Sequence, residues 1–431
     1  MARGYNRLPL AAALLAAASS ANAGISIPAG DWTLDIGGIV NAYYTSTKAS
    51  GTGGGYTAGA NNNGASTKSN ITTGLLPNYL TVSGTTRQND LDVGFTISIQ
   101  PGAATTSSLS LGGGSEHRQQ FLTFGDKSWG SIKLGKDLGI FASDAILNDM
   151  TLLGVGSGAG TLNGTTTLGR IGTGYIYADW KNQIAYTTPN FNGFSGTVGV
   201  TQGWNENGTG SMMAANGSSS QAGGASPAFE GKASYAWTGD VAGKVWVSGI
   251  SQRVKDAGSV AAVTGVAPQT GSSGGVGFVQ GVAPVAAVAG KGITANAYDI
   301  GASVSAAGFN VVGYYFNGEG IGNQYQFSSG VDALGNKRNS DGGYVQVTYV
   351  LPTATKIGAS WGTSNLDATA ADLDGNVKNE MWTIGAYHPL TKHLNLVAEY
   401  SDAKDTQDAK GSHAATEARA KTVSLGAILF F

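Results

Sequence analysis

The chain has 431 residues, a formal net charge of −2 and no cysteine. A charge so close to zero offers no basic patch for nucleic acid, and the lack of cysteine excludes thiolate-bound metal, thiol catalysis and a disulfide framework. Charged residues make up only 12% of the chain, while 68 residues are glycine. No segment after the N-terminus resembles a transmembrane helix, so the composition is typical of an exported, membrane-spanning β-barrel.

The first 23 residues are predicted to be a secretory signal peptide. Arg3 and Arg7 provide its positive end, residues 8–18 form a short apolar run, and Ala-Asn-Ala at 21–23 is the cleavage site. A first structural helix is the alternative, but the run is too short to span a bilayer, which takes ~20 residues. We therefore expect one folded domain at 24–431.

The next feature is a series of segments in which apolar and polar residues alternate, as they do in strands whose two faces meet different surroundings. In 91–100, apolar residues occupy every odd position, and small or polar residues occupy the even ones. Segment 31–45 alternates similarly, with Tyr43 on its polar face, and 228–237 places Glu230 and Lys232 on that face. A soluble sandwich has the same period, so alternation alone does not identify a membrane protein.

Short and long connections alternate along the chain. The short turns lie at 85–89, 126–130, 189–193, 238–243, 306–309, 351–355 and 389–392. The long loops lie at about 46–74, 101–116, 138–178, 205–227, 257–292, 319–340, 366–378 and 404–417. This arrangement predicts an all-β fold, a transmembrane antiparallel barrel of about sixteen strands with tight turns at one end and extended loops at the other. A hairpin hidden in 257–292 would add two strands.

The last predicted strand, at 421–431, ends the chain on an aromatic residue. Val423, Leu425, Leu429 and Phe431 share one face of it. Left open, such a strand would be an apolar edge prone to aggregation, so we expect it to pair with the first strand and close the barrel. A terminal aromatic on such a strand also resembles the signal read by the outer-membrane assembly machinery, which makes Phe431 the expected assembly signal.

Several segments partly match nucleotide-binding or metal-binding motifs, but their surrounding sequence does not fit those motifs. The segment 130–137 (GSIKLGKD) misses the phosphate-loop pattern by one residue and alternates as a strand does. The acidic turn at 372–375 has the wrong register for a calcium loop, although calcium in the outer loops stays open. The four histidines, at 117, 388, 393 and 413, show no ligand or general-base spacing. We expect no enzyme activity, no catalytic residues, no cofactor and no metal site.

The most specific pattern is the order of motifs in 118–194. Arg118 is followed by a short turn, the segment Gly130–Lys136, a long loop at 138–178 and the segment Tyr186–Phe194 (YTTPNFNGF). This order resembles the region around the third loop of the general Gram-negative porins. The resemblance covers the whole mature chain, more weakly outside this stretch.

The resemblance implies that 138–178 folds into the barrel as a constriction loop, with acidic residues on the loop opposite basic residues on the wall. The residues so assigned are Asp144 and Asp149 on the loop and Arg118, Lys136 and Arg170 on the wall. It also implies a homotrimer. Tyr79 stands where the family often has an inward arginine, which indicates weaker selectivity than in better-known members.

Alternation adds further inward residues to this expected constriction. If Ile132 and Leu134 face outward, alternation places Lys133 inside the barrel. The same alternation along 179–189 places Lys181 inside. Phe121 taken as outward places Arg118 on the inner side.

The resulting expectation is an outer-membrane porin that lets small hydrophilic solutes and ions diffuse passively through a water-filled channel. Its partners would be outer-membrane lipid and lipopolysaccharide, the assembly machinery and two further copies of itself, with no nucleic acid. Two alternatives remain: a substrate-selective channel lined by aromatic residues, and a non-transporting structural or adhesive surface barrel. Small inward residues such as Gly94 and Thr96 argue against a plugged barrel.

Overall fold

The structure is a computed structural model. It describes residues 24–52, 56–57, 67–101, 115–158, 161–162, 166–203, 226–257 and 290–431. The expected signal peptide at 1–23 and most of the stretch in which a further hairpin was considered lie outside the described residues.

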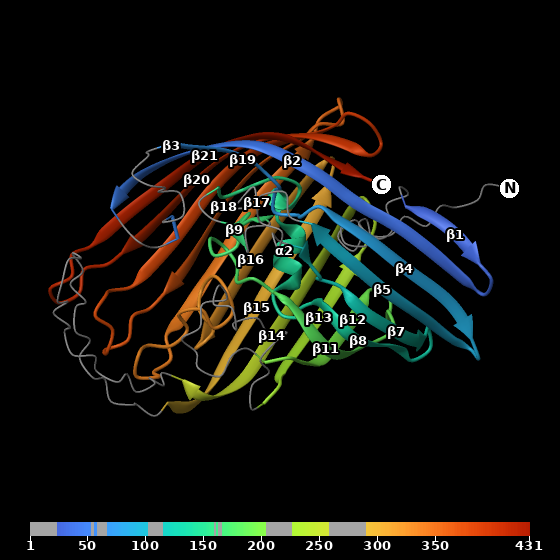
Figure 1. Ribbon diagram of the computed structural model, residues 1–431, viewed down its shortest axis with the longest axis horizontal. Helices are drawn as coiled ribbons and strands as arrows, with labels where there is room; N and C mark the ends of the chain where they lie inside the picture. Colours follow the sequence, from blue (N-terminus) through green and yellow to red (C-terminus); the bar gives the residue numbers. More distant parts are fainter. Residues whose placement is uncertain are drawn as a thin grey trace, which may run out of the picture.

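Sixteen long strands form one closed antiparallel barrel, as predicted (Figure 1). They are β2 (Trp32–Thr52), β4 (Tyr79–Gln88), β5 (Leu91–Pro101), β7 (Gln120–Asp126), β8 (Gly130–Leu138), β11 (Trp180–Thr187), β12 (Phe194–Thr201), β13 (Ala228–Trp237), β14 (Val241–Ala257), β15 (Lys291–Ala306), β16 (Phe309–Glu319), β17 (Asn339–Val350), β18 (Lys356–Leu366), β19 (Val377–Pro389), β20 (Leu394–Gln407) and β21 (Thr416–Phe430). Each pairs with the next, and β21 closes the ring by pairing with β2 from Ile39↔Phe430 to Thr52↔Glu417. Closure leaves no unpaired edge for aggregation.

Short strands extend the first barrel strand at both of its ends. β1 (Ile25–Ala29) pairs with the start of β2, and β3 (Thr67–Thr72) pairs with its second half. The predicted loop at 46–74 was therefore too long, because β2 continues to Thr52 and β3 returns along it. The alternation in this stretch is masked in the sequence by small and polar residues.

The turns and the long loops gather at opposite ends of the barrel, as predicted. Between β4 and β5 the whole connection is Asn89 and Asp90, both with positive φ (47° and 63°), the requirement of the two-residue turns that match strand twist. In Figure 1 these turns lie on the right with the C-terminus, and the described connections β16–β17, β18–β19 and β20–β21 lie on the left. Among the described residues, no helix is long and apolar enough to cross a membrane.

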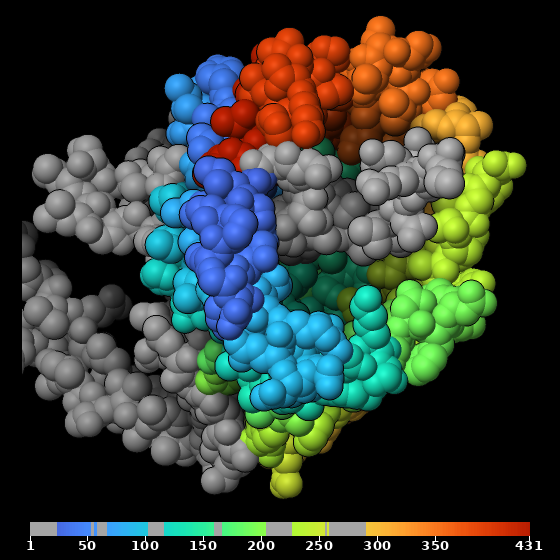
Figure 2. All heavy atoms as spheres, turned by 90° about the vertical axis from the view of Figure 1, so that its right-hand side faces the viewer, coloured from blue at the N-terminus to red at the C-terminus, as the bar shows by residue number. Residues whose placement is uncertain are grey.

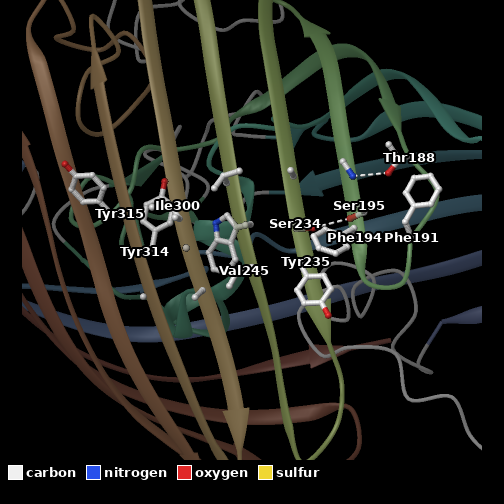
Figure 3. Close-up of a pocket in the computed structure, with 17 residues that line it drawn as sticks. Thr188, Phe191, Phe194, Ser195, Ser234, Tyr235, Val245, Ile300, Tyr314 and Tyr315 are labelled. Atoms are coloured by element: carbon white, nitrogen blue, oxygen red, sulfur yellow. Dashed lines mark hydrogen bonds between the residues drawn. The ribbon is translucent and has the colours of Figure 1, made fainter.

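The outer face of the barrel is apolar. On β15, Tyr298 and Ile300 are more than half exposed, whereas Asp299 between them is buried inside. Figure 3 shows part of this outer face, where Phe194, Tyr235 and Val245 surround a shallow apolar groove. Exposed apolar side chains in a continuous band are what a lipid-facing barrel surface requires.

The inside of the barrel contains a segment of the chain as well as open space. Seen from the end that carries the short turns, the strands surround a hollow, with teal-green atoms in its depth (Figure 2). This segment, residues 139–179, connects β8 to β11 and includes the helix α2 (Ser143–Asn148), the 3₁₀ helix η2 (Met150–Leu153) and the short strands β9 (Thr161–Leu162) and β10 (Thr166–Thr167). We call it the inserted segment.

One predicted orientation is wrong. Phe121 pairs with Thr96 and Gly135 and lies on the inner face, where its ring contacts the Lys133 ammonium at 4.8 Å from the ring centre. Leu122, not Phe121, faces outward. The sequence FLTF carries apolar residues at both parities, so its alternation could not distinguish the two faces.

Candidate functional site

The inserted segment enters the barrel interior at a carboxylate on the wall. Glu230 projects inward from β13 and accepts hydrogen bonds from the backbone N–H groups of Ile140 and Phe141, both at 2.8 Å. The base of the segment is closed by a hydrogen bond from the Gly139 N–H to the Asp179 carbonyl at 2.7 Å. Two orphan donors next to a carboxylate are a strong, charge-assisted arrangement, and they fix where the segment leaves the wall.

The helix α2 is then held by β13, β14 and β17. The carboxylate of Asp144, in its first turn, forms ion pairs with Lys232 at 3.0 Å and with Lys244. The Tyr344 hydroxyl donates to the Ala145 carbonyl at 2.8 Å. Gln346 accepts from the Met150 N–H, which fixes the end of the helix as well.

A second wall carboxylate holds the following turn. Glu399 on β20 accepts from the N–H groups of Val155 and Gly156, each at 2.8 Å, and from the Tyr387 hydroxyl at 2.6 Å. Across the barrel seam, Tyr43 on β2 donates to the Leu153 carbonyl at 2.7 Å. The segment is thus bonded to inner-face side chains on strands that lie far apart around the barrel.

Asp149 and Arg170 do not face each other across open space. Both belong to the inserted segment, both side chains have no exposed surface, and their closest charged atoms are 4.0 Å apart. Arg170 donates to the Met381 carbonyl at 2.9 Å and to the Ser360 hydroxyl, while Asp149 accepts from Thr151. Arg170 is therefore not an exposed wall base, because the hydrogen bonds of its guanidinium hold the segment against β18 and β19.

Apolar side chains fill the space between the inserted segment and one side of the barrel. The segment contributes Phe141, Ile171, Tyr175 and Ile176 to this cluster, and the wall contributes Trp246, Tyr314, Phe316, Tyr344 and Met381. We call the inner faces of β13 to β20 the packed wall. Burying such large side chains contributes about 1.5–3 kcal/mol each, so the segment is an integral part of the fold.

The opposite side of the barrel is not filled in this way. A cavity of about 130 Å³ lies between the inserted segment and the inner faces of β4, β5, β7 and β8, which we call the free wall. Tyr79, Thr81, Thr96 and Phe121 line it from the wall, and Ile146 is among the residues that line it from the segment. Tyr79 lies on the inner face, as the sequence predicts, and pairs with Ile39 on β2.

Arg118 lies at the long-loop end of this cavity. Its side chain is buried, bonded to Glu116 at 2.7 Å, and lies over the Trp180 ring at 5.7 Å. Strand parity does not place it there, because residues 117–119 are not part of strand β7, which begins at Gln120. The sequence argument reached the inner side from a wrong orientation of Phe121.

The remaining predicted bases differ in position. Lys133 is on the free wall and pairs with Asp137. Lys181 is fully buried and bonded to Glu230 and Gln326. Lys136 lies opposite Asn182 and Gln120 on the neighbouring strands. It is on the same outward face of the sheet as Leu134 and Ile184, so it does not face the channel. The resemblance made Lys136 a wall base at the start of the loop, whereas β8 continues to Leu138 and carries Lys136 on its outer face.

In three inner ion pairs the lysine is more exposed than its acidic partner. Lys133 is 32% exposed and its partner Asp137 11%. Lys232 and Lys244 are 23% and 21% exposed, whereas the Asp144 carboxylate they share is 4% exposed. At these pairs a solute therefore meets more ammonium than carboxylate surface, whereas at the Arg118 pair Glu116 is the more exposed partner.

Several residues of this site were not among the predicted constriction residues. Glu230 and Lys232 had been placed on the inner face by alternation, but nothing local indicated that they hold residues 140–144. Glu399 has no local signal beyond being an acid in an alternating strand. Within the described part of the chain, no group of acidic or histidine residues could hold a metal ion.

The last residue closes the barrel seam. Phe431 donates its N–H to the Gly38 carbonyl at 3.1 Å and accepts from the Gly38 N–H at 2.7 Å. A Cβ on Gly38 would lie 2.7 Å from the Phe431 ring, so only glycine allows this close approach.

Comparisons with known proteins agree with this architecture. A sequence profile of the family described as Gram-negative porin matches residues 10–408. No curated protein sequence matches the chain. Among solved structures, the outer membrane channel DcaP of Acinetobacter baumannii superposes with a TM-score of 0.62 at 15% identity, over 94% of this chain and 99% of that one.

Two further structures extend this likeness. Outer-membrane expressed OmpT of Vibrio cholerae gives a TM-score of 0.55 at 15% identity, over 94% of this chain and 100% of that one. The Salmonella typhi OmpF complex with daunomycin gives 0.51 at 15% identity, with 94% and 100% covered. At these identities the structural likeness establishes a shared fold.

Proposed function

This chain belongs to the Gram-negative porin family and forms an outer-membrane channel for diffusion of small hydrophilic solutes and ions, and we propose that the inserted segment sets the width of that channel. The observation that carries the proposal is the pair of wall carboxylates. Glu230 holds the beginning of the segment and Glu399 its middle, on strands far apart around the ring. A segment fixed at such separated points crosses the interior and reduces the open cross-section.

Shortening the segment tests this directly. Replacing residues 143–176 by Gly-Ser-Gly should raise single-channel conductance severalfold in planar bilayers, because the ionic current follows the narrowest cross-section. The control shortens 367–376, an outer loop between β18 and β19, and should leave conductance nearly unchanged. Unaltered conductance in barrels lacking the segment, with assembly verified by heat-modifiable gel mobility, would locate the constriction elsewhere.

The exposed charges support a second element of the proposal, a preference for anions. Lys133, Lys232 and Lys244 present more surface to the interior than their acidic partners do. Rings of like charge are a common basis of selectivity in pores. Lys244→Gln should shift the zero-current potential in a KCl gradient toward cations, and Asp144→Asn toward anions.

The salt dependence of these shifts separates a field effect from a change of shape. Both should shrink at high salt, because screening acts over ~10 Å at 0.1 M and ~3 Å at 1 M. Asp149→Asn should leave the potential unchanged, since that carboxylate has no exposed surface. Cation preference in the unaltered protein would contradict the assignment.

A homotrimer is the proposed assembly. The trimer form of Vibrio cholerae OmpT superposes with a TM-score of 0.52 at 15% identity, which supports the proposal through the shared fold. The apolar outer face would meet lipid and lipopolysaccharide, and Phe431 would be read by the assembly machinery. Light scattering of the detergent-solubilised protein tests the trimer, and a mass of one chain would reject it.

A further inference from the structure

Buried polar atoms without partners surround the cavity at the free wall. Among the described lining residues they are the Tyr79, Thr81 and Thr166 hydroxyls, the Nε1 atom of Trp180 and the Nη2 atom of Arg118. Arg118, Thr81 and Thr166 are all more than nine-tenths buried. Buried polar groups normally have hydrogen-bond partners, so several unpaired groups around one cavity indicate a guest that supplies oxygen or nitrogen atoms.

Half of the lining residues are apolar, and the lining amides of Gln100 and Gln119 are already hydrogen-bonded within the protein. The apolar lining residues are Leu75, Leu76, Pro77, Phe121, Leu138, Ile146, Leu147, Leu152 and Ile171. Sugars and small ions gain nothing from such a surface, because their own polar groups would lose water without replacement. An apolar ring gains the free energy of leaving water.

The size of the cavity restricts the guest to one ring. Its volume is about 130 Å³. An engineered apolar cavity of about 150 Å³ in another protein admits one benzene molecule, so the two volumes belong to the same class. Binding sites of this kind typically combine an apolar lining with a few oriented polar groups.

Charge balance selects an uncharged guest over an anion. The Arg118 guanidinium is already paired with Glu116 at 2.7 Å, and Asp179 is a second carboxylate close enough to act on it electrostatically. The Nη2 atom can still donate a hydrogen bond, but the group has no net positive charge to offer. A carboxylate guest would meet two carboxylates and one guanidinium.

From these observations we propose that the free-wall cavity is a binding site for uncharged, single-ring aromatic solutes that carry a hydrogen-bond acceptor. The proposal rests on the channel function above and names a solute class for one side of the channel. The ring would pack among the leucine and isoleucine side chains, and its oxygen would accept from Arg118 or from the unpaired hydroxyls. Gln100 and Arg118 lie toward the long loops, so the polar end of the site faces the outer entrance.

Benzamide, benzoate and acetamide form a matched set of probes for this site. Benzamide keeps the ring and an uncharged acceptor, benzoate exchanges the acceptor for a charge, and acetamide lacks the ring. In single-channel recordings in KCl, benzamide should interrupt the current in a concentration-dependent way, benzoate less, and acetamide not at all. Stronger interruption by benzoate than by benzamide would overturn the proposal, and so would no effect of benzamide on a conducting channel.

Two variants sharpen the test. Thr81→Leu fills the cavity and removes one hydroxyl, and it should abolish the effect of benzamide while KCl conductance persists. Thr85→Leu, on the same inner face of β4 but outside the cavity, is the matched control and should respond as the unaltered protein does. Equal responses of these two variants would contradict the site.

Glu116→Gln tests the charge argument itself. Removing this carboxylate leaves the Arg118 charge less compensated, so the order of the two ring probes should shift toward benzoate. A merely structural role of Glu116 would weaken both probes alike, and that outcome would overturn the charge argument. If shortening the inserted segment fails to change conductance but benzamide still interrupts the current, the width proposal fails and this site stands.

Discussion

The packed wall and the free wall are built from strands of the same antiparallel pairing and the same period, yet they relate differently to the inserted segment. On the packed wall the inner positions carry Trp246, Tyr314, Phe316 and Tyr344, which interlock with the segment. On the free wall the inner positions include Gly94, Thr96 and Ser98, and a cavity separates wall from segment. The free wall also carries Tyr79 and Phe121, but these two line the cavity instead of interlocking with the segment, so this side stays available to solutes.

Charges follow this division only in part, because Lys232 and Lys244 on the packed wall are also partly exposed. On the packed side, ionic groups such as Arg170 and Glu399 have little or no exposed surface and bind backbone groups of the segment or the wall. On the free wall, Lys133 remains one-third exposed beside Asp137. Buried charges cost desolvation unless they are fully bonded, whereas half-exposed ones act on whatever passes.

The largest expected effect breaks the packed side. Arg170→Gln removes a buried charge next to Asp149 and should lower the free energy of unfolding by about 3–5 kcal/mol, because the remaining carboxylate is left without its ionic partner. Lys133→Gln on the free wall should cost at most about 1 kcal/mol, since partly exposed pairs contribute little. Urea titrations in lipid vesicles measure both.

The same two variants should rank in the opposite order when their effects on ion selectivity are compared. Lys133→Gln should shift the zero-current potential toward cations, and Arg170→Gln should not. Equal stabilities of the two variants, or a selectivity shift in Arg170→Gln without loss of stability, would remove the distinction between the two walls.

The barrel itself could be predicted from the sequence, because its signal is repetitive. Sixteen alternating segments, each followed by a turn or loop of the expected kind, leave little choice of architecture. The inner position of Tyr43 and the outer position of Val423 also follow from parity. Phe121 was misplaced because its strand has apolar residues on both faces.

The site was less predictable, because its contacts join residues distant in sequence. Nothing near Glu399 indicates that it accepts hydrogen bonds from residues 155 and 156, more than two hundred positions earlier. Asp149 and Arg170 were expected to face each other, and they lie close together, but the apolar residues around them bury the pair. Sequence order identified the segment, and only the fold distinguishes its exposed charges from its buried ones.

A smaller effect on stability is expected for lysine substitutions on the outer and inner faces of one strand, β12. Val198 is 61% exposed on the outer face of β12, and Thr197 beside it faces inward. Val198→Lys should cost about 2–4 kcal/mol if it lies near the bilayer midplane, whereas an ammonium in the lumen is hydrated. Thr197→Lys should assemble nearly as well as the unaltered protein, as quantified from outer-membrane fractions.

The seam between the two walls should be more tolerant. Phe431→Ala keeps both backbone hydrogen bonds to Gly38 and loses only a ring that is 38% exposed, which should cost roughly 1 kcal/mol. Deleting Phe431 also removes the hydrogen bonds, and it should lower the yield of assembled barrels without altering the conductance of those that form. Normal yield of the deletion variant at normal expression would show that this residue is not an assembly signal.

The smallest effect concerns the loops above the packed wall, which are tied by Arg338 and Asp372. The Arg338 guanidinium, together with the Thr369 N–H, lowers the pKa of Asp372 to about 2. A folded-state pKa below the unfolded value of about 3.9 means that the contribution to stability is present above pH 4 and is lost as the pH falls toward 2. The gain is at most about 1 kcal/mol, because the pair is near the surface.

Pepsin digestion at two pH values can detect this tie. At pH 4 the loops of Asp372→Asn should be cleaved faster than those of the unaltered protein, by up to about fivefold for 1 kcal/mol. At pH 2 the difference should shrink, because protonation removes the same charge from the unaltered Asp372. The matched variant Asp374→Asn changes a neighbouring carboxylate that is more than half exposed. If the cleavage rates of Asp372→Asn and the unaltered protein differ by the same factor at both pH values, the loops are held by packing. The Arg338–Asp372 ion pair would then not stabilise them.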